Sequence, residues 1–155
     1  MKEPLLRRLL ARLPHKDITK DGTLYLRRHY LTPRTWPYKV FLHLINRPDG
    51  DRDPHCHPWP FWTLVLRGGY AEAFFDRGTF KGVDDLGPGA FRFRPATHTH
   101  LIHHLDGPTW TLVLAGPATR TWGFWNALNE FIPWFNYIQR EDGAKPEPLP
   151  EDVVR

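Results

Sequence analysis

The sequence has little of what defines several large classes of protein. Cysteine occurs once in 155 residues, so no disulfide can form within the chain, and a reducing, cytoplasmic location is expected. No apolar run approaches the roughly 18 residues that a membrane-spanning helix needs. The net charge is only +4, and basic and acidic residues are interspersed. These features predict neither a membrane partner nor a nucleic-acid partner.

Aromatic residues, by contrast, are plentiful. They make up 14% of the chain and include seven tryptophans, a composition typical of folded globules rather than disordered chains. The length is sufficient for one domain with a substantial core. We therefore predict a single domain over residues 1–155.

The middle of the chain alternates between strand-forming runs and turn residues. The turns are rich in Gly and Pro, and no long helical pattern separates the runs. Gly68 and Gly69 directly follow one run, so we expect the next run to return as the second strand of a hairpin. Strands at this spacing predict an all-β fold, either an antiparallel sandwich or a barrel. The runs cover residues 24–31, 38–45, 61–66, 70–75, 90–94, 98–104, 110–115 and 119–125.

Both ends of the chain depart from this pattern. Residues 4–13 place leucines on one side and arginines on the other, which predicts a short amphipathic helix. Its leucines would dock on the domain or on a second copy in a homodimer; a membrane-surface anchor or a targeting helix is the alternative. Residues 126–140 predict an aromatic helix interrupted by Pro133, and 141–155 an extended tail. The domain thus divides into an N-terminal segment, a β-barrel and a C-terminal segment: 1–23, 24–125 and 126–155.

Two histidines, His55 and His57, lie two positions apart just before a strand-forming run. In an extended backbone, residues i and i+2 point to the same side, so both imidazoles can reach one metal ion. Cys56 lies between them with opposite parity and is expected to pack away from the ion. A second histidine cluster, within residues 98–104, makes a metal site more credible than a solvent-exposed pair.

A small antiparallel β-fold with a His-x-His pair before one strand and a further histidine on a later strand resembles the cupin superfamily. It also resembles a cupin family of bacteria and phages that carries His-x-His-Pro-Trp and has no assigned reaction. The first cupin motif has a Gly, a His-x-His pair, a Glu and a closing Gly. Here Gly50 precedes the pair, and Gly68 or Gly69 follows it. The second motif has a His five residues after a Pro, a spacing that Pro95 and His100 match.

The resemblance extends over residues 38–125 and implies a small jelly-roll barrel, or double-stranded β-helix, with short N- and C-terminal helices. It implies that His55, His57 and His100 bind one divalent transition metal. Fe2+ is the first candidate, and Zn2+, Ni2+ and Mn2+ are alternatives. His98 has the same strand parity as His100 and could replace it as a ligand or stand beside it.

The position of the motif's Glu holds Phe61 or Trp62, and neither can bind a metal. Two arrangements could replace the usual ligand set. Three histidines alone could hold the ion, similar to the thiol dioxygenases of the superfamily, or Glu72 could supply a carboxylate from the next strand. If Glu72 faces inward with Tyr70 and Phe74, the buried acid must pair with a cation or meet a metal. Otherwise it faces solvent.

Other residues are candidates for the reaction itself. Glu72 and His43 are candidate catalytic residues that would handle protons; His43 could instead be a core histidine or support a ligand imidazole. Arg92 and Arg94 would hold an anionic group of the substrate if they face inward, and would be solvent-exposed otherwise. Tyr70 is a candidate pocket wall.

The expected function is that of a metal-dependent enzyme, an iron dioxygenase or related oxidoreductase acting on a small polar molecule. A second hypothesis is a non-catalytic cupin that binds a metal or ligand without turnover. A third is a metal-independent sugar isomerase or epimerase that uses a histidine base. Oxygen uptake abolished by His57→Ala would favour the first, and activity undiminished by chelators the third.

Overall fold

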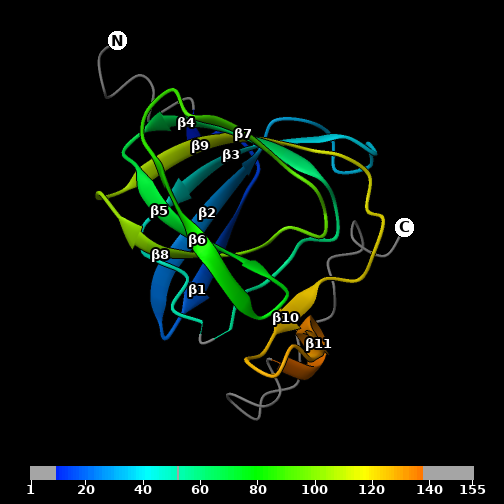
Figure 1. The fold of residues 1–155 in the computed structure, drawn as a ribbon. Helices are drawn as coiled ribbons and strands as arrows, with labels where there is room; N and C mark the ends of the chain where they lie inside the picture. Colours follow the sequence, from blue (N-terminus) through cyan, green and yellow to red (C-terminus); the bar gives the residue numbers. More distant parts are fainter. Residues whose placement is uncertain (1–9, 52, 138–155) are drawn as a thin grey trace.

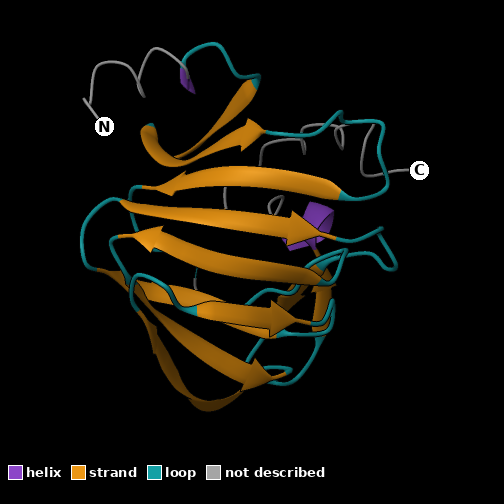
Figure 2. Ribbon diagram, turned by 90° about the horizontal axis from the view of Figure 1, so that it is seen from above, coloured by secondary structure: helices purple, strands orange, loops and turns teal. Residues whose placement is uncertain are grey.

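The computed structural model describes residues 10–51 and 53–137. Within these residues, eleven strands form two facing β-sheets and a small two-stranded sheet at one end (Figures 1 and 2). All the sheet pairings are antiparallel, which confirms the predicted all-β class. No described helix is long and apolar enough to cross a membrane. The strands are β1 His15–Lys20, β2 Thr23–Tyr30, β3 Lys39–Ile45, β4 Phe61–Arg67, β5 Tyr70–Asp76, β6 Thr79–Leu86, β7 Phe91–Arg94, β8 Thr99–Leu105, β9 Thr109–Ala115, β10 Gly123–Trp125 and β11 Phe131–Pro133.

The larger sheet has six strands in the order β1-β2-β3-β9-β4-β7. Its inward face follows from alternation along each strand. In β3, Phe41 and Ile45 are buried and His43 lies between them on the same face. The central strand β9 pairs with both β3 and β4, which sets Thr111 opposite His43. This sheet therefore presents a mainly apolar wall with His43 embedded in it.

The opposite wall is the three-stranded sheet β6-β5-β8. Apolar side chains from both sheets meet between them, and burying each one contributes roughly 1.5–3 kcal/mol. A neighbouring apolar cluster includes Phe61, whose ring centroid lies 4.8 Å from that of His57. The core thus borders the predicted site directly. The cluster between the sheets consists of Leu26, Ile45, Val65, Tyr70, Leu86 and Ile102.

The turn at Gly68 and Gly69 does not form the predicted hairpin. β4 pairs with β7 and β9, whereas β5 pairs with β6 and β8, so the chain crosses from one sheet to the other at this turn. Gly68 has a φ of 79°, and a Cβ there would lie 2.6 Å from Thr109 Oγ1. Glycine is needed at this crossing. The local pattern indicated a turn but not which sheet the next strand joins.

The C-terminal segment also differs from the prediction. A helix was expected over residues 126–140. Instead β11 pairs with β10, and among the described residues of this range only 134–137 are helical. The Tyr137 ring stacks on Phe124 with centroids 3.7 Å apart, so aromatic packing fixes this helical turn against β10. The β10–β11 pairing satisfies backbone groups that the expected helix would have used.

Two further strands, β1 and β6, were missed by the sequence pattern, because many of their residues are polar and neither reads as an apolar run. Residues 4–9 of the predicted helix over residues 4–13 lie outside the described residues; of the other four, residue 10 is helical and residues 11–13 form a turn and a bend. The predicted tail over residues 141–155 lies wholly outside the described residues. The single-domain organisation over residues 1–155 stays a prediction.

Candidate metal centre and adjoining pocket

His55 and His100 are brought together by the backbone. The His55 N–H donates to the His100 carbonyl at 3.0 Å, and the His100 N–H donates to the His55 carbonyl at 2.9 Å. Directly opposed residues of an antiparallel bridge project their side chains to the same side. The next residue, Cys56, donates its N–H to the Gly123 carbonyl at 3.0 Å. The histidine-bearing segment is therefore held between β8 and β10 (Figure 1).

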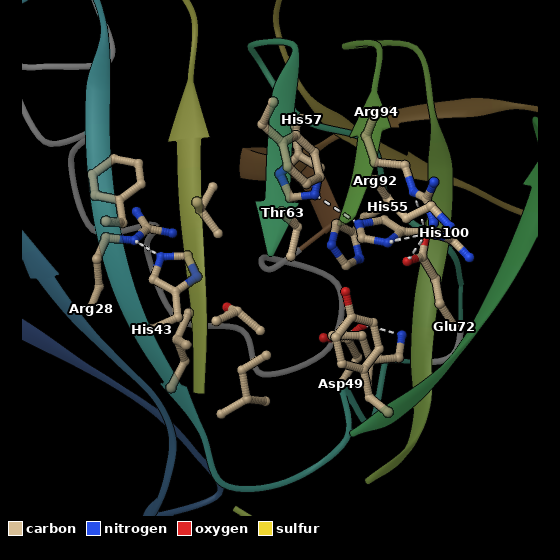
Figure 3. A pocket seen from close by; sticks show the side chains of 18 of the residues that line it. Arg28, His43, Asp49, His55, His57, Thr63, Glu72, Arg92, Arg94 and His100 are labelled. Atoms are coloured by element: carbon tan, nitrogen blue, oxygen red, sulfur yellow. Dashed lines mark hydrogen bonds and ion pairs between the residues drawn. The ribbon is translucent and has the colours of Figure 1, made fainter. Parts of the chain in front are cut away.

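His57 completes a group of three imidazoles, because it shares the parity of His55. The ring centroids lie 5.2 Å apart for His55 and His57, 4.9 Å for His55 and His100, and 5.0 Å for His57 and His100. His57 Nε2 lies 2.8 Å from His100 Nε2 (Figure 3). One ring nitrogen from each residue lies within 4.8 Å of the other two. The predicted metal-binding residues thus converge on one point from two distant segments.

The donor set suits a divalent transition metal. Burial lowers the pKa of His55 to about 4, and burial followed by the neighbouring His100 lowers the pKa of His57 well below its ordinary value. Both imidazoles are therefore neutral at pH 7 and keep a lone pair, as metal binding requires. His55 Nδ1 is buried and has no hydrogen-bond partner among the described residues. Such an orphaned nitrogen is costly unless something else satisfies it.

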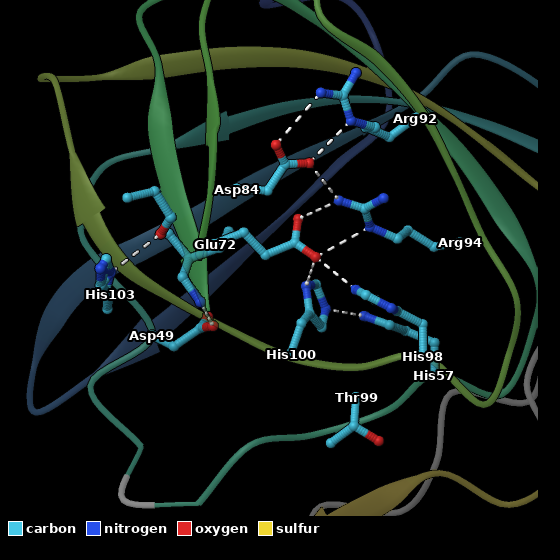
Figure 4. A network of polar contacts seen from close by, with 12 residues as sticks. Asp49, His57, Glu72, Asp84, Arg92, Arg94, His98, Thr99, His100 and His103 are labelled. Atoms are coloured by element: carbon cyan, nitrogen blue, oxygen red, sulfur yellow. Dashed lines mark hydrogen bonds and ion pairs between the residues drawn. The ribbon is translucent and has the colours of Figure 1, made fainter. Parts of the chain in front are cut away.

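Glu72 faces inward and is 2% exposed, so the inward alternative for this residue is confirmed. Arg94 grips its carboxylate through Nε at 3.0 Å and Nη2 at 3.1 Å, and His98 Nε2 lies 2.6 Å from Oε1 (Figure 4). His100 Nδ1 is 3.0 Å from the same oxygen, at ion-pair distance but not aligned as a hydrogen bond. Burial alone would raise the pKa of Glu72, but His100, His98 and Arg94 together outweigh it and hold that pKa far below its usual value.

Two groups of three donors therefore share His100. One consists of His55, His57 and His100, and the other of Glu72, His98 and His100. In the second group both carboxylate oxygens already contact the Arg94 guanidinium. An ion there would compete with that guanidinium for the same oxygens. The first group carries no such cation on its nitrogens.

The arginines of β7 line the pocket, but their guanidinium groups bind acidic side chains. Arg92 pairs with Asp84 at 2.9 Å, and Arg94 contacts Asp84 at 3.5 Å in addition to Glu72 (Figure 4). These ion pairs join β7 of the larger sheet to β5 and β6 of the smaller one. We call this group of four side chains the inter-sheet seam. His98 likewise contacts Glu72, and Cys56 is fully buried and belongs to neither donor group.

A cavity of about 110 Å³ adjoins the histidines and has room for several waters or a small ligand. Tyr70 lines it, as predicted, and so does Trp59. On the far wall, Arg28 Nε donates to His43 Nε2 at 3.0 Å (Figure 3). Asp49, also in the lining, accepts hydrogen bonds from the Tyr25 hydroxyl and, at 2.6 Å, from the Ile102 N–H.

Sequence reasoning missed three of these pocket residues. Arg28 had a usable signal, because it shares strand parity with Leu26 and Tyr30, which are buried, and an inward arginine among apolar residues is unusual. Tyr25 and Asp49 had none, since their hydrogen bond joins a strand to a turn residue far along the chain.

Comparison with known proteins supports the fold. No protein-family model and no protein of curated function matches the sequence. Among solved structures, Fe(II)-HppE aligns with a TM-score of 0.56 and 16% identity, over 68% of this chain and 57% of its own. A provisionally assigned mannose-6-phosphate isomerase from Ralstonia eutropha aligns with a TM-score of 0.53 and 20% identity, over 71% and 95%. A mutant of Bacillus subtilis oxalate decarboxylase OxdC aligns with a TM-score of 0.53 and 16% identity, over 72% and 29%.

Identities this low establish a shared architecture and no shared reaction. The molecule is an antiparallel β-barrel with the cupin fold, as the two histidine motifs implied. The chain spans only 57% of the length of HppE, so that enzyme has parts with no counterpart in this alignment.

Proposed function

We propose that the chain is a metal-dependent cupin enzyme that binds one divalent transition metal through His55, His57 and His100 and oxidises a small polar molecule. Iron(II) is our first choice of metal. One observation carries the proposal: three inward-facing imidazoles from two distant segments converge beside a ligand-sized cavity. The shared fold with Fe(II)-HppE supports the choice of iron, while imidazole ligands alone are compatible with several metals.

When bound, the ion would supply a Lewis-acidic and, for iron, redox-active centre for the substrate and dioxygen. The chain's own residues would orient that centre. Glu72 contacts His100 at Nδ1, the ring edge away from Nε2, and so favours the orientation in which Nε2 faces His57. The aromatic rings of Phe61 and Trp59 would keep bulk water from the cavity.

This arrangement supports a positioning role for Glu72 rather than the proton-handling role expected from sequence. A carboxylate whose pKa is held far below its usual value is a weak proton acceptor at neutral pH. Its four contacts from Arg94, His98 and His100 also leave its oxygens little access to a substrate.

Metal analysis of protein purified without a histidine tag tests the proposal. We expect one transition-metal ion per chain, and loss of that ion in His55→Ala, His57→Ala and His100→Ala measured separately. His104→Ala is the matched control, because that side chain is 66% exposed and its ion-pair partner among the described residues is Asp106. Full metal occupancy in any of the three variants would remove that histidine from the site.

Oxygen consumption by the iron-loaded protein tests the reaction class. A panel of small thiols, diketones and hydroxy acids would be offered, and His57→Ala should abolish any uptake seen. Stoichiometric metal without turnover across the panel would favour a non-catalytic cupin.

A metal-independent isomerase is the second candidate, and one observation favours it. The provisionally assigned mannose-6-phosphate isomerase aligns over 95% of its length, so nearly the whole of that chain has a counterpart in this one. In that case sugar-phosphate isomerisation would survive a chelator that strips the metal, whereas the proposed oxidation would not.

A further inference from the structure

Arg28 and His43 form a fixed pair on the wall of the cavity that faces the histidine cluster. They are direct cross-strand partners in β2 and β3, so their side chains leave the same face of the sheet. The Arg28 guanidinium lies over the Phe41 ring at 4.8 Å, and His43 stacks on that ring at 5.6 Å with an interplanar angle of 15°. One aromatic ring therefore braces both members of the pair.

The hydrogen bond between them determines which nitrogen of His43 carries the proton. A guanidinium can only donate, so Nε2 must accept the hydrogen bond from Arg28 Nε with its lone pair. Burial, reinforced by the charge of Arg28, lowers the pKa of His43 well below its ordinary value, so the ring is neutral at pH 7. A neutral imidazole with a free lone pair on Nε2 has its hydrogen on Nδ1.

That Nδ1–H is turned toward the cavity. His43 lines the cavity, and the ring edge opposite Arg28 points into it (Figure 3). Among the described residues no acceptor is hydrogen-bonded to Nδ1. A donor at a cavity wall that lacks a protein partner is available to a ligand.

We infer that His43, locked by Arg28, is a hydrogen-bond donor that binds an anionic oxygen, such as a carboxylate oxygen, of the pocket ligand. The positive charge of Arg28 directly behind the ring favours a negative acceptor over a neutral one. The inference rests on the proposed function in taking this cavity as the substrate site. It replaces the expectation that His43 is a base, because the nitrogen that faces the cavity is already protonated.

The tautomer is tested first, by long-range 1H–15N correlation spectra of metal-free protein at pH 7. His43 is identified by the signals that disappear in His43→Phe, which keeps a ring to stack on Phe41. We expect a pyrrole-type Nδ1 and a pyridine-type Nε2. Arg28→Gln should allow both tautomers, whereas Arg27→Gln should change nothing, because Arg27 pairs with Asp17. A pyridine-type Nδ1 in the wild type would overturn the inference.

Ligand class is tested in the same metal-free samples with acetate, and with acetamide as its neutral isostere. We expect acetate to shift the His43 Nδ1 signal and acetamide to shift it less. Acetate binding should weaken about 10- to 100-fold in His43→Phe and in Arg28→Gln, and stay unchanged in Arg27→Gln. Equal binding of acetate and acetamide, no acetate-dependent shift, or unchanged affinity in His43→Phe would each refute the assignment.

The metal content of the same variants separates this inference from the proposed function. His43→Phe and Arg28→Gln should both bind metal like the wild type, because neither His43 nor Arg28 belongs to the two donor groups. Failure of the tautomer test with normal metal loading counts against the inference alone. A normal tautomer with no metal binding counts against the proposed function alone.

Discussion

Replacing Glu72 by Gln tests which donor group holds the ion. Glutamine keeps the size of the side chain and one acceptor oxygen but removes the negative charge. Arg94, whose side chain is 12% exposed, then loses its main counter-charge, since its remaining carboxylate contact is Asp84 at 3.5 Å. His100 also loses the anion 3.0 Å from Nδ1.

The expected losses of stability and of metal affinity follow from the burial of the Arg94–Glu72 pair. Breaking a buried ion pair from one side costs about 3–5 kcal/mol of unfolding free energy. For a chain of this size that corresponds to a fall in Tm of roughly 6–20 °C. Loss of a carboxylate that supports a ligand histidine weakens metal binding by about 10- to 100-fold. Because Glu72 is not itself a ligand in our proposal, saturating metal should still give one ion per chain.

Urea unfolding followed by tryptophan fluorescence gives the stability, and metal competition followed by elemental analysis gives affinity and stoichiometry. Asp85→Asn is the matched control, since it removes one acidic charge from an exposed position on β6. His98→Gln, which leaves Glu72 ionised, should also keep one ion per chain. The reasoning is refuted if Glu72→Gln and His98→Gln lose the ion at saturation while His57→Ala retains it.

Further predictions concern pH and the crossing between the sheets. The metal-free protein should lose stability as pH falls from 6.5 towards 4. Burial lowers the pKa of His55 to about 4, so over this range His55 becomes protonated in the unfolded state but stays neutral in the folded state. The loss is on the order of 3 kcal/mol, and unfolding free energies that are equal at pH 7 and pH 4.5 would contradict it. Glu72, whose pKa is also lowered, adds a loss of stability of the same sign as pH falls below the ordinary glutamate pKa of 4.5. Gly68→Ala should lower the unfolding free energy by about 1–3 kcal/mol through its left-handed backbone and its contact with Thr109, while Gly87→Ala, which meets open space, should be nearly neutral by the same urea assay.

The three converging histidines could be predicted because local rules suffice for each. The spacing of His55 and His57 sets their common side, and a proline five residues earlier singled out His100. Their meeting depends on a backbone bridge between residues 45 positions apart, which the cupin resemblance implied and no local pattern contains.

The pairings around those histidines could not be predicted. Parity left open whether Glu72 faced the interior, and nothing local joined it to Arg94, which lies in the other sheet. Gly68 and Gly69 predicted a turn. The strands that pair with β5 depend instead on which apolar faces meet in the core, and the local sequence does not specify this. The tautomer of His43 follows from Arg28, a residue of a different strand.

The inter-sheet seam has a consequence for the kind of molecule the pocket can select. Histidines 55, 57 and 100 are anchored to the smaller layers, whereas the Arg28–His43 pair belongs to the larger one. A ligand that touches both ends must therefore match the separation of the layers, which the ion pairs of Arg92 and Arg94 help to fix. Salt screens the partly exposed Arg92–Asp84 contact most strongly. Raising the ionic strength should therefore weaken the Arg92–Asp84 pair before the more deeply buried Arg94–Glu72 pair.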